Sequence, residues 1–165
     1  MSPAMVIVLM GVSGAGKTTI GAMLAAALKW RFYEGDALHS AANRAKMSRG
    51  IALTDADRLP WLRRIRRLIE RNLADRVDAV VACSALKQSY RELIAPDVKR
   101  VQFVYLKGSP TRIAAHLKQR KGHFMPGSLL QSQFEALEEP RDAITIDVSG
   151  TLAQIVAAIR NRLAL

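Results

Sequence analysis

Residues 11 to 18 read Gly-Val-Ser-Gly-Ala-Gly-Lys-Thr, the spacing G-x-x-x-x-G-K-T, and they follow directly on an apolar run from Met5 to Met10. This order is typical of a buried strand, a glycine-rich loop and a helix. Glycine lets the backbone curl so that successive N–H groups point inward, where phosphate oxygens can accept from them. An ordinary tight turn needs no such eight-residue match. We therefore expect residues 11–18, called loop 11–18 below, to bind phosphate groups.

The side chains of the loop predict a nucleoside triphosphate with its magnesium ion. The Lys17 ammonium can reach the outer phosphates, and the Thr18 hydroxyl can bind Mg²⁺. A helix expected from Lys17 to about Lys29 directs the positive end of its dipole at the same phosphates. The residues predicted to bind the nucleotide are Gly11, Ser13, Gly14, Ala15, Gly16, Lys17, Thr18 and Thr19.

Length and composition predict a single domain over residues 1–165, because half of the chain is hydrophobic and its length suits one core. No apolar stretch approaches 18 residues, and the N-terminus does not read as a secretion signal, so we expect a soluble cytoplasmic protein without a membrane partner. Cys83 is the only cysteine. An intrachain disulfide and a thiolate-rich metal site are therefore excluded, and we expect Cys83 to pack at the end of a strand.

The net charge of +11 raises the possibility of a nucleic-acid partner. The densest basic run, residues 63–67, falls in a helix whose apolar stripe is Leu62, Ile65 and Ile69, so most of its arginines should face solvent. Aromatic residues that could stack on bases make up only 5% of the chain. We therefore expect no nucleic-acid partner. A positive field equally suits an enzyme with two anionic substrates.

Short apolar runs alternate with helical patterns along the chain, which predicts an α/β fold with a five-stranded parallel sheet flanked by helices. Several runs are continuous rather than alternating, as in strands covered on both faces. The last helix shows helical spacing from Leu152 to Leu163. The expected strands are Met5–Met10, a short one near Arg31–Glu34, Asp78–Cys83, Val101–Leu106 and Ala143–Val148.

Two polar segments do not read as framework: one spans about residues 36–61 and the other about residues 120–127. We interpret the first as a substrate segment and the second as a mobile lid. In an open α/β sheet, ligands bind beyond the carboxyl ends of the strands. The segments that begin at residues 11, 36, 84 and 107 each follow a predicted strand, so they should converge on one edge of the sheet.

Asp36 and Arg120 are the candidate catalytic residues beside Lys17. Asp36 follows the second strand and could bind an acceptor hydroxyl, or the magnesium shell through water, although it could instead cap a helix at Ala37. Arg120 and Lys121 could fold over the triphosphate and neutralise developing charge. A solvated basic loop is the alternative for these two residues.

Further segments extend the pattern through nearly the whole chain. They are Gly35-Asp36-Ala37-Leu38-His39, Asn43 with Lys46-Met47, Leu53-Thr54-Asp55-Ala56-Asp57-Arg58 with Pro60-Trp61-Leu62, Cys83-Ser84-Ala85-Leu86-Lys87 with Tyr90-Arg91, Tyr105-Leu106-Lys107-Gly108, and Arg120-Lys121-Gly122-His123-Phe124 with Gln133-Phe134-Glu135.

In this order and spacing the chain resembles the bacterial gluconokinase family, which belongs with the shikimate and nucleoside monophosphate kinases. The resemblance implies a single-domain P-loop kinase with a mobile lid. It also implies transfer of the γ-phosphate of ATP, with Mg²⁺, to the 6-hydroxyl of D-gluconate, usually by a homodimer. Family members often have Asp where Glu34 stands and Pro where Ser40 and Ala52 stand. The longer Glu34 side chain and the two missing prolines could alter the metal shell and loosen the substrate segment.

A pocket for gluconate should supply a planar cation for its carboxylate and polar groups for its hydroxyls. Arg58 is the first choice for that cation, since the similar shikimate kinases place a substrate-binding arginine at the start of the corresponding helix. Arg58 could instead form an ion pair with Asp55 or Asp57. The other expected substrate-binding residues are Asp36, His39, Ser84, Lys87 and His123, the expected metal-binding residues are Thr18 and Asp36, and the adenine is expected between the lid base and Ser149-Gly150.

Two rival functions remain open from the sequence. The nearer one is a related P-loop kinase that acts on another sugar acid or polyol. The other is a nucleotide-binding regulator associated with nucleic acid, which would use the positive net charge.

Overall fold

Five strands form a single parallel sheet in the order β2-β3-β1-β4-β5. The structure is a computed structural model that describes residues 2–119 and 127–165. Each predicted strand is present with its ends within one residue of the expected positions. The strands are β1 Val6–Met10, β2 Arg31–Glu34, β3 Ala79–Ala82, β4 Val101–Lys107 and β5 Ile144–Asp147.

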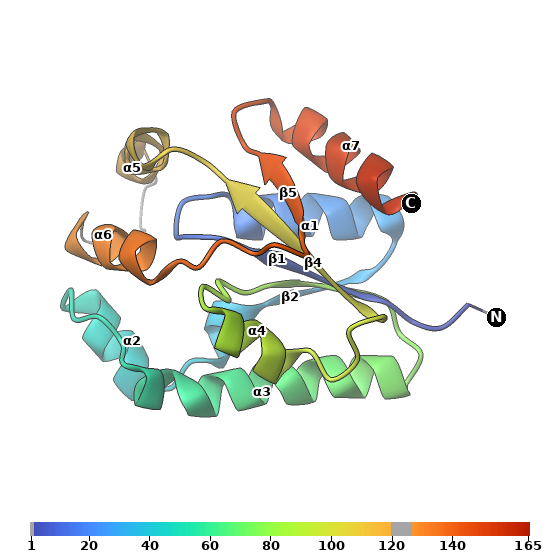
Figure 1. Cartoon of the computed structure of the whole chain (residues 1–165), viewed down its shortest axis with the longest axis horizontal. Coiled ribbons are helices and arrows are strands. Elements are labelled where there is room, and N and C mark those ends of the chain that lie inside the picture. The colour runs from blue at the N-terminus through green and yellow to red at the C-terminus, as the bar shows by residue number, and fades with distance from the viewer. Residues whose placement is uncertain (1, 120–126) are drawn as a thin grey trace.

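Helices cover both faces of this sheet, so the fold is the expected three-layer α/β arrangement (Figure 1). Helices α1 and α7 lie against one face, and α3 and α4 lie against the other. Helices α2, α5 and α6 gather at the end where the strands finish, and both termini lie at the opposite end. The helices are α1 Lys17–Leu28, α2 Ala41–Ser48, α3 Asp55–Ala74, α4 Gln88–Ile94, α5 Pro110–Gln119, α6 Gly127–Ala136 and α7 Leu152–Leu163, with a 3₁₀ turn, η1, at Gly35–Leu38. Over the described residues, no helix has the length and apolar character needed to cross a bilayer.

The central strand β1 divides the core into two layers because successive side chains point to opposite faces. Val6, Val8 and Met10 pack toward α3 and α4, whereas Ile7 and Leu9 pack toward α1 and α7. All five are fully buried. Burial of each such side chain contributes roughly 1.5–3 kcal/mol, so the continuous apolar run of β1 is required by its central place.

Helix α3 confirms the interpretation of the basic run. Leu62, Ile65 and Ile69 lie on its buried face against the sheet. Arg63 and Arg67 are exposed to solvent. These arginines therefore lie on the outer face of an amphipathic helix, and the basic run is a surface that faces solvent.

The register of the strands brings three functional segments to one edge of the sheet. Leu9 of β1 and Glu34 of β2 are both paired with Ala82 of β3. These three strands therefore end nearly level, and loop 11–18, η1 and Ser84 follow them side by side. Cys83 comes directly after β3 and is fully buried, as expected from the sequence.

Gly35 sits where the chain leaves β2 and passes very close to β3. A Cβ atom added there would lie 2.3 Å from the Ala82 carbonyl oxygen, which belongs to the backbone of the adjacent strand. At Gly21, a comparable added Cβ would lie 2.6 Å from Cε1 of the Phe32 ring. A side chain can rotate away, whereas the interior strand β3 cannot move without disturbing the sheet.

We therefore expect Gly35→Ala to lower the free energy of unfolding by about 1–3 kcal/mol or more, and by more than Gly21→Ala does. The alanine at position 21 also gains from helix propensity, which offsets part of its steric cost. Urea unfolding of both variants measures the difference. Equal losses, or a stable Gly35→Ala protein, would show that the edge between β2 and β3 is less constrained than the geometry indicates.

Candidate active site

A cavity opens at the carboxyl edge of the sheet, between loop 11–18, η1, α3 and α6. It brings together residues from segments far apart in the chain. The predicted site residues that line it are Ser13, Lys17, Asp36, His39, Arg58 and Ser84. Residues that the sequence analysis did not assign also line it, among them Trp61 and Gln133.

Loop 11–18 has the curled backbone that its glycines predict. Gly11, Gly14 and Gly16 all have positive φ angles, of 148°, 84° and 95°. Residues that carry a side chain rarely adopt such positive φ angles, which explains why glycine is needed at these positions. The Lys17 ammonium donates to the carbonyl oxygens of Gly11 and Val12, both at 3.0 Å, so it is held over the loop.

The N–H group of Ser13 is bonded by a side chain from α6. Gln133 Oε1 accepts from it at 2.6 Å. A ligand oxygen that takes this N–H group has to displace the glutamine oxygen. The sequence analysis named Gln133 only as part of a segment that resembles the family and gave it no role. The two residues are 120 positions apart, so no local spacing predicts their contact.

The end of β2 joins the start of α1 through Glu34. Thr18 Oγ1 donates a hydrogen bond to Glu34 Oε2, and the Asp36 backbone N–H donates to Glu34 Oε1 at 3.3 Å. Glu34, rather than Asp36, is therefore the cap of η1, and the alternative that Asp36 serves as a helix cap is wrong. The Asp36 side chain instead lines the cavity.

The oxygens at this edge suit a magnesium ion that arrives with phosphate. The Thr18 hydroxyl and the Glu34 carboxylate are hard oxygen donors in direct contact. Among residues 2–119 and 127–165, no group of three or more His, Cys, Asp or Glu side chains could hold a metal ion by itself. Mg²⁺ typically takes only one or two protein oxygens and completes its shell with phosphate and water, so the arrangement fits that mode of binding.

Arg58 contacts a tyrosine rather than the two aspartates considered for it. Its Nη1 donates to the Tyr90 hydroxyl at 3.2 Å, and its Cζ lies 5.7 Å from the centre of that ring. Asp55 pairs with Lys87 at 2.9 Å and also accepts from the Tyr90 hydroxyl. These bonds hold the pKa of Asp55 below its usual range, with the tyrosine as the larger cause. Asp57 pairs with a lysine of α2.

Lys87 is consequently engaged outside the cavity. Its ammonium bonds Asp55 and lies 5.6 Å from the centre of the Tyr90 ring. Within the described ranges, it is not part of the cavity wall. The structure thus brings Arg58 and Ser84 to the cavity wall, whereas Lys87 pairs with Asp55.

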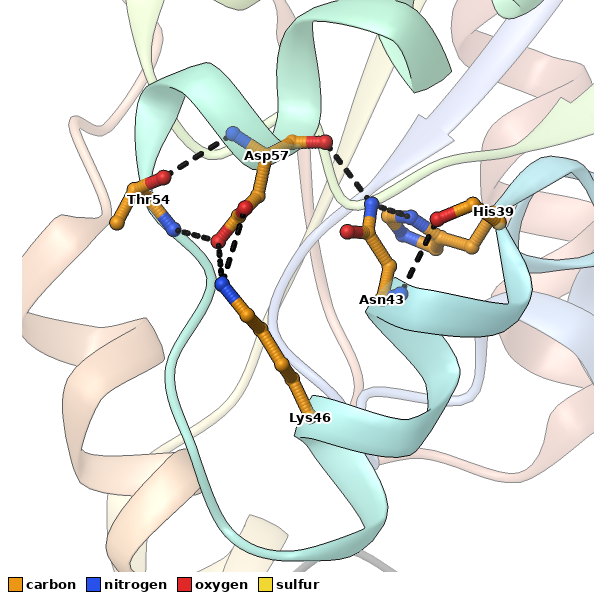
Figure 2. Close-up of polar contacts among 6 residues, drawn as sticks. His39, Asn43, Lys46, Thr54 and Asp57 are labelled. Atoms are coloured by element: carbon orange, nitrogen blue, oxygen red, sulfur yellow. Dashed lines mark hydrogen bonds and ion pairs between the residues drawn. The ribbon is translucent and has the colours of Figure 1, made fainter.

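Polar contacts hold the two ends of segment 36–61 together, as Figure 2 shows. Thr54 and Asp57 form a capping box at the start of α3, and Asp57 Oδ2 also accepts from Lys46 Nζ at 2.9 Å. These bonds, chiefly the one from the Thr54 backbone, lower the pKa of Asp57 to about 2. Asn43 bonds the Asp57 carbonyl oxygen at 2.9 Å, and Ser40 caps α2. Ser40 Oγ accepts from the Asn43 backbone N–H group, so this serine has a structural role.

His39 is packed flat against Trp61. The ring centres are 4.1 Å apart and the ring planes are inclined by 16°. Trp61 is held in turn by its Nε1 donating to the Gly35 carbonyl oxygen at 2.8 Å. Burial lowers the pKa of His39 to about 4, and nearby arginines act in the same direction against the opposing charge of Asp36. The ring is therefore neutral near pH 7.

A second hollow lies on the other side of loop 11–18. It adjoins Gly150, near which the adenine is expected. The residues around it include Gly14, Ala15, Gly16, Arg112, His116, Gly150 and Leu152. Arg120 and His123, and the predicted lid up to residue 126, lie outside the described residues.

Comparisons with known proteins show which family the chain is similar to. Residues 13–161 match the family model described as shikimate kinase. A gluconokinase of Gluconobacter oxydans is 50% identical over 82% of this chain and 76% of its own length. A thermosensitive gluconokinase of Escherichia coli is 43% identical over 93% and 84%, respectively. The crystal structure of a gluconokinase from Sinorhizobium meliloti superposes with a TM-score of 0.82 at 44% identity, covering 98% of this chain and 96% of that chain.

The neutral His39 ring predicts a pH dependence of stability. Above pH 6.5 the ring is neutral in both the folded and the unfolded chain, so it adds no dependence. Between pH 6.5 and about 4, the unfolded chain binds the proton more readily, so the free energy of unfolding falls as pH falls. Because a single proton is involved, this loss is at most about 1.4 kcal/mol per pH unit.

Urea unfolding of the wild type and of His39→Gln at pH 7, 6 and 5 measures this dependence. The glutamine cannot titrate, so the variant should lose less stability than the wild type between pH 6.5 and 5. Parallel curves for the two proteins would contradict a neutral buried His39.

Proposed function

The chain belongs to the shikimate kinase family and, within it, to the gluconokinases; from this premise we propose that it transfers the γ-phosphate of ATP to the 6-hydroxyl of D-gluconate. The hydroxyl oxygen forms the new bond to phosphorus, the bond to the leaving ADP oxygen breaks, and the hydroxyl proton is released. The products are 6-phospho-D-gluconate and ADP. This is the reaction of an ATP-dependent phosphotransferase with an alcohol group as acceptor.

The observation that carries the proposal is the shared cavity. Lys17 from the phosphate-binding loop, Asp36 from η1 and Arg58 from α3 line one space at the carboxyl edge of the sheet. Phosphoryl transfer needs a cation on the phosphates, an oriented acceptor and a means of holding the rest of the acceptor molecule. The three side chains match these needs in type.

Loop 11–18 is assigned to the triphosphate, with its N–H groups, Lys17 and Thr19 on the phosphate oxygens. The hollow beside Gly150 is assigned to the adenine. Binding of the phosphates exchanges the Gln133 oxygen on the Ser13 N–H group for a phosphate oxygen. Arg120 is assigned to charge developing on the transferred group, on the basis of the sequence alone.

Thr18 and Asp36, with Glu34 between them, are assigned to the magnesium ion that accompanies ATP. When bound there, the ion would supply positive charge that offsets the charge of the phosphates. The Thr18 hydroxyl has to release Glu34 Oε2 or share it with the ion. The Asp36 carboxylate also accepts a hydrogen bond from the 6-hydroxyl and takes its proton as the new bond forms.

Gluconate recognition is assigned chiefly to Arg58 and His39. The Arg58 guanidinium can leave the neutral Tyr90 hydroxyl for the gluconate carboxylate, since a charged acceptor forms the stronger bond. His39 and Ser84 serve the hydroxyls. Lys87 and His123 are assigned more remote roles, because Lys87 is paired with Asp55 and the assignment of His123 rests on the sequence. We further propose a cytoplasmic homodimer, which the family resemblance supports.

Release of ADP should rise steeply on addition of D-gluconate and should require a divalent ion. A loop-bound triphosphate reacts with water slowly until the acceptor completes the site. A coupled ADP assay with gluconate, shikimate, glycerate and other sugar acids measures this. Equal rates of ADP release with every acceptor, or the same rate without an acceptor, would overturn the proposal. A faster rate with another acceptor would favour a related kinase that acts on another sugar acid or polyol.

Arg58→Ala should raise the KM for gluconate and lower kcat/KM by about 30- to 150-fold, or about 2–3 kcal/mol, because a charged bond to the carboxylate is lost. The Kd for ATP should stay within about threefold, since loop 11–18 is a different segment. Arg58→Lys keeps the charge without the planar fork, so a partial defect is expected.

Arg63→Ala is the matched control, because Arg63 lies on the exposed face of the same helix. It should leave both ligands unaffected, since an exposed charge contributes under about 1 kcal/mol. Melting temperatures are measured alongside. A loss of both ligands together in Arg58→Ala would point to damage of the Tyr90 contact and would make Lys87 the next candidate.

A further inference from the structure

The orientation of the Asn43 side chain is fixed by its two neighbours. Its Nδ2 lies 2.9 Å from the carbonyl oxygen of Asp57 and 3.2 Å from Nδ1 of His39 (Figure 2). A carbonyl oxygen can only accept, so the amide nitrogen rather than the amide oxygen must face it. The same NH₂ group can only donate to His39. Nδ1 of His39 therefore carries a lone pair and no proton.

The proton of the neutral ring must then sit on Nε2, since a neutral imidazole carries one N–H group. The charged groups that act on the ring are Asp36 from η1, Arg44 from α2, and Arg58 and Arg64 from α3. The three arginines and burial oppose a second proton and outweigh the attraction of Asp36. The ring is only 8% exposed.

The other ring nitrogen of His39, Nε2, belongs to a side chain that lines the cavity. Within residues 2–119 and 127–165, no protein atom bonds Nε2, and the one buried side-chain polar atom without a partner is Nε of Arg160. Nε2 therefore keeps some contact with solvent, and the cavity that His39 lines together with Asp36 and Arg58 is the space into which its N–H group can donate.

We propose that Asn43 is a positioning residue that holds His39 in the Nε2–H tautomer, so that the ring presents a hydrogen-bond donor to a hydroxyl oxygen of the acceptor substrate. The identity of that substrate rests on the proposed function. In this arrangement His39 selects for an acceptor oxygen with a free lone pair and cannot act as the base. Proton removal is left to Asp36.

The network around Asn43 explains why a polar side chain is buried there. Asn43 is 6% exposed, and its NH₂ group links η1 to the first turn of α3. Asp57, whose carbonyl oxygen orients the amide, is itself held by Thr54 and Lys46. The tautomer of one ring thus depends on contacts along segment 36–61.

The first test uses the wild-type protein without substrate. Long-range ¹H–¹⁵N correlation spectra distinguish protonated from unprotonated imidazole nitrogens, and His39→Gln assigns the signals. We expect Nε2 of His39 to be protonated and Nδ1 unprotonated from pH 8 down to about pH 5, with protonation only near the pKa of about 4. A ring protonated on Nδ1, or one that exchanges freely between tautomers, overturns the inference.

The second test replaces the donor by an acceptor of the same shape. In Asn43→Asp the carboxylate can only accept, so Nδ1 of His39 should become protonated. The KM for gluconate should then rise by on the order of tenfold, while the KM for ATP stays within about threefold. The KM is read at pH 8, and either an unprotonated Nδ1 or a wild-type KM for gluconate beside a neutral ring protonated on Nδ1 in this variant overturns the inference.

Asn72→Asp is the matched control. Asn72 is also buried, at 4% exposure, and its Nδ2 donates to the Leu68 carbonyl oxygen at 2.8 Å, away from the cavity. It should lower the melting temperature without changing the KM for gluconate. An equal rise of that KM in Asn72→Asp would mean that the effect is one of general stability.

A double variant separates positioning from structure. A glutamine at position 39 carries its own NH₂ donor whatever stands at position 43, so the effect of Asn43→Asp on the KM for gluconate should largely disappear in the His39→Gln background. A full additive effect there would overturn the inference. Failure of gluconate-dependent ADP release would count against the proposed function, whereas the spectra of the free protein decide the tautomer.

Discussion

Parallel pairing of all five strands is the constraint on which the rest of the structure depends. Every strand must be followed by a crossover that returns the chain to the opposite edge, so all carboxyl ends lie at one edge. The nearly level ends of β1, β2 and β3 place loop 11–18, Asp36 and Ser84 around one cavity. The buried, apolar strands are the consequence of helices on both faces, and the polar chemistry is confined to the loops.

The wall of the cavity formed by segment 36–61 is held in a different way. Beside the buried Trp61, polar contacts hold it in place: the Trp61 indole on the Gly35 carbonyl, the Lys46 pair with Asp57, and the Asn43 amide between His39 and α3. The partly exposed pair of Lys46 with Asp57 contributes little to global stability. These contacts are directional, however, and so they determine where hydrogen-bond donors and acceptors face the cavity.

The sequence predicted what depends on local pattern and left open what depends on distant partners. The alternation of short apolar runs with helical patterns predicted the strands to within a residue, and the glycine spacing predicted the curled backbone of loop 11–18. The partner of Arg58 could not be predicted, because Tyr90 lies on another helix. Asp55, which the sequence offered as a partner, pairs with Lys87 instead. The alternative that Asp36 caps a helix was wrong, because the Glu34 side chain reaches the Asp36 N–H group and caps η1 itself. Contacts such as Gln133 with Ser13 carry no signal in spacing at all.

Cys83 gives this fold a property unrelated to its chemistry. The thiol is fully buried behind the end of β3, and burial raises its pKa to about 12, so it is neither accessible nor ionised in the folded protein. Thiol reagents attack the thiolate and need access to the sulfur. Because the chain has no second cysteine, the rate at which such a reagent labels it reports how often the middle of the sheet comes apart. The protein thus carries its own single-site probe of opening, at the point where its strands meet its ligands.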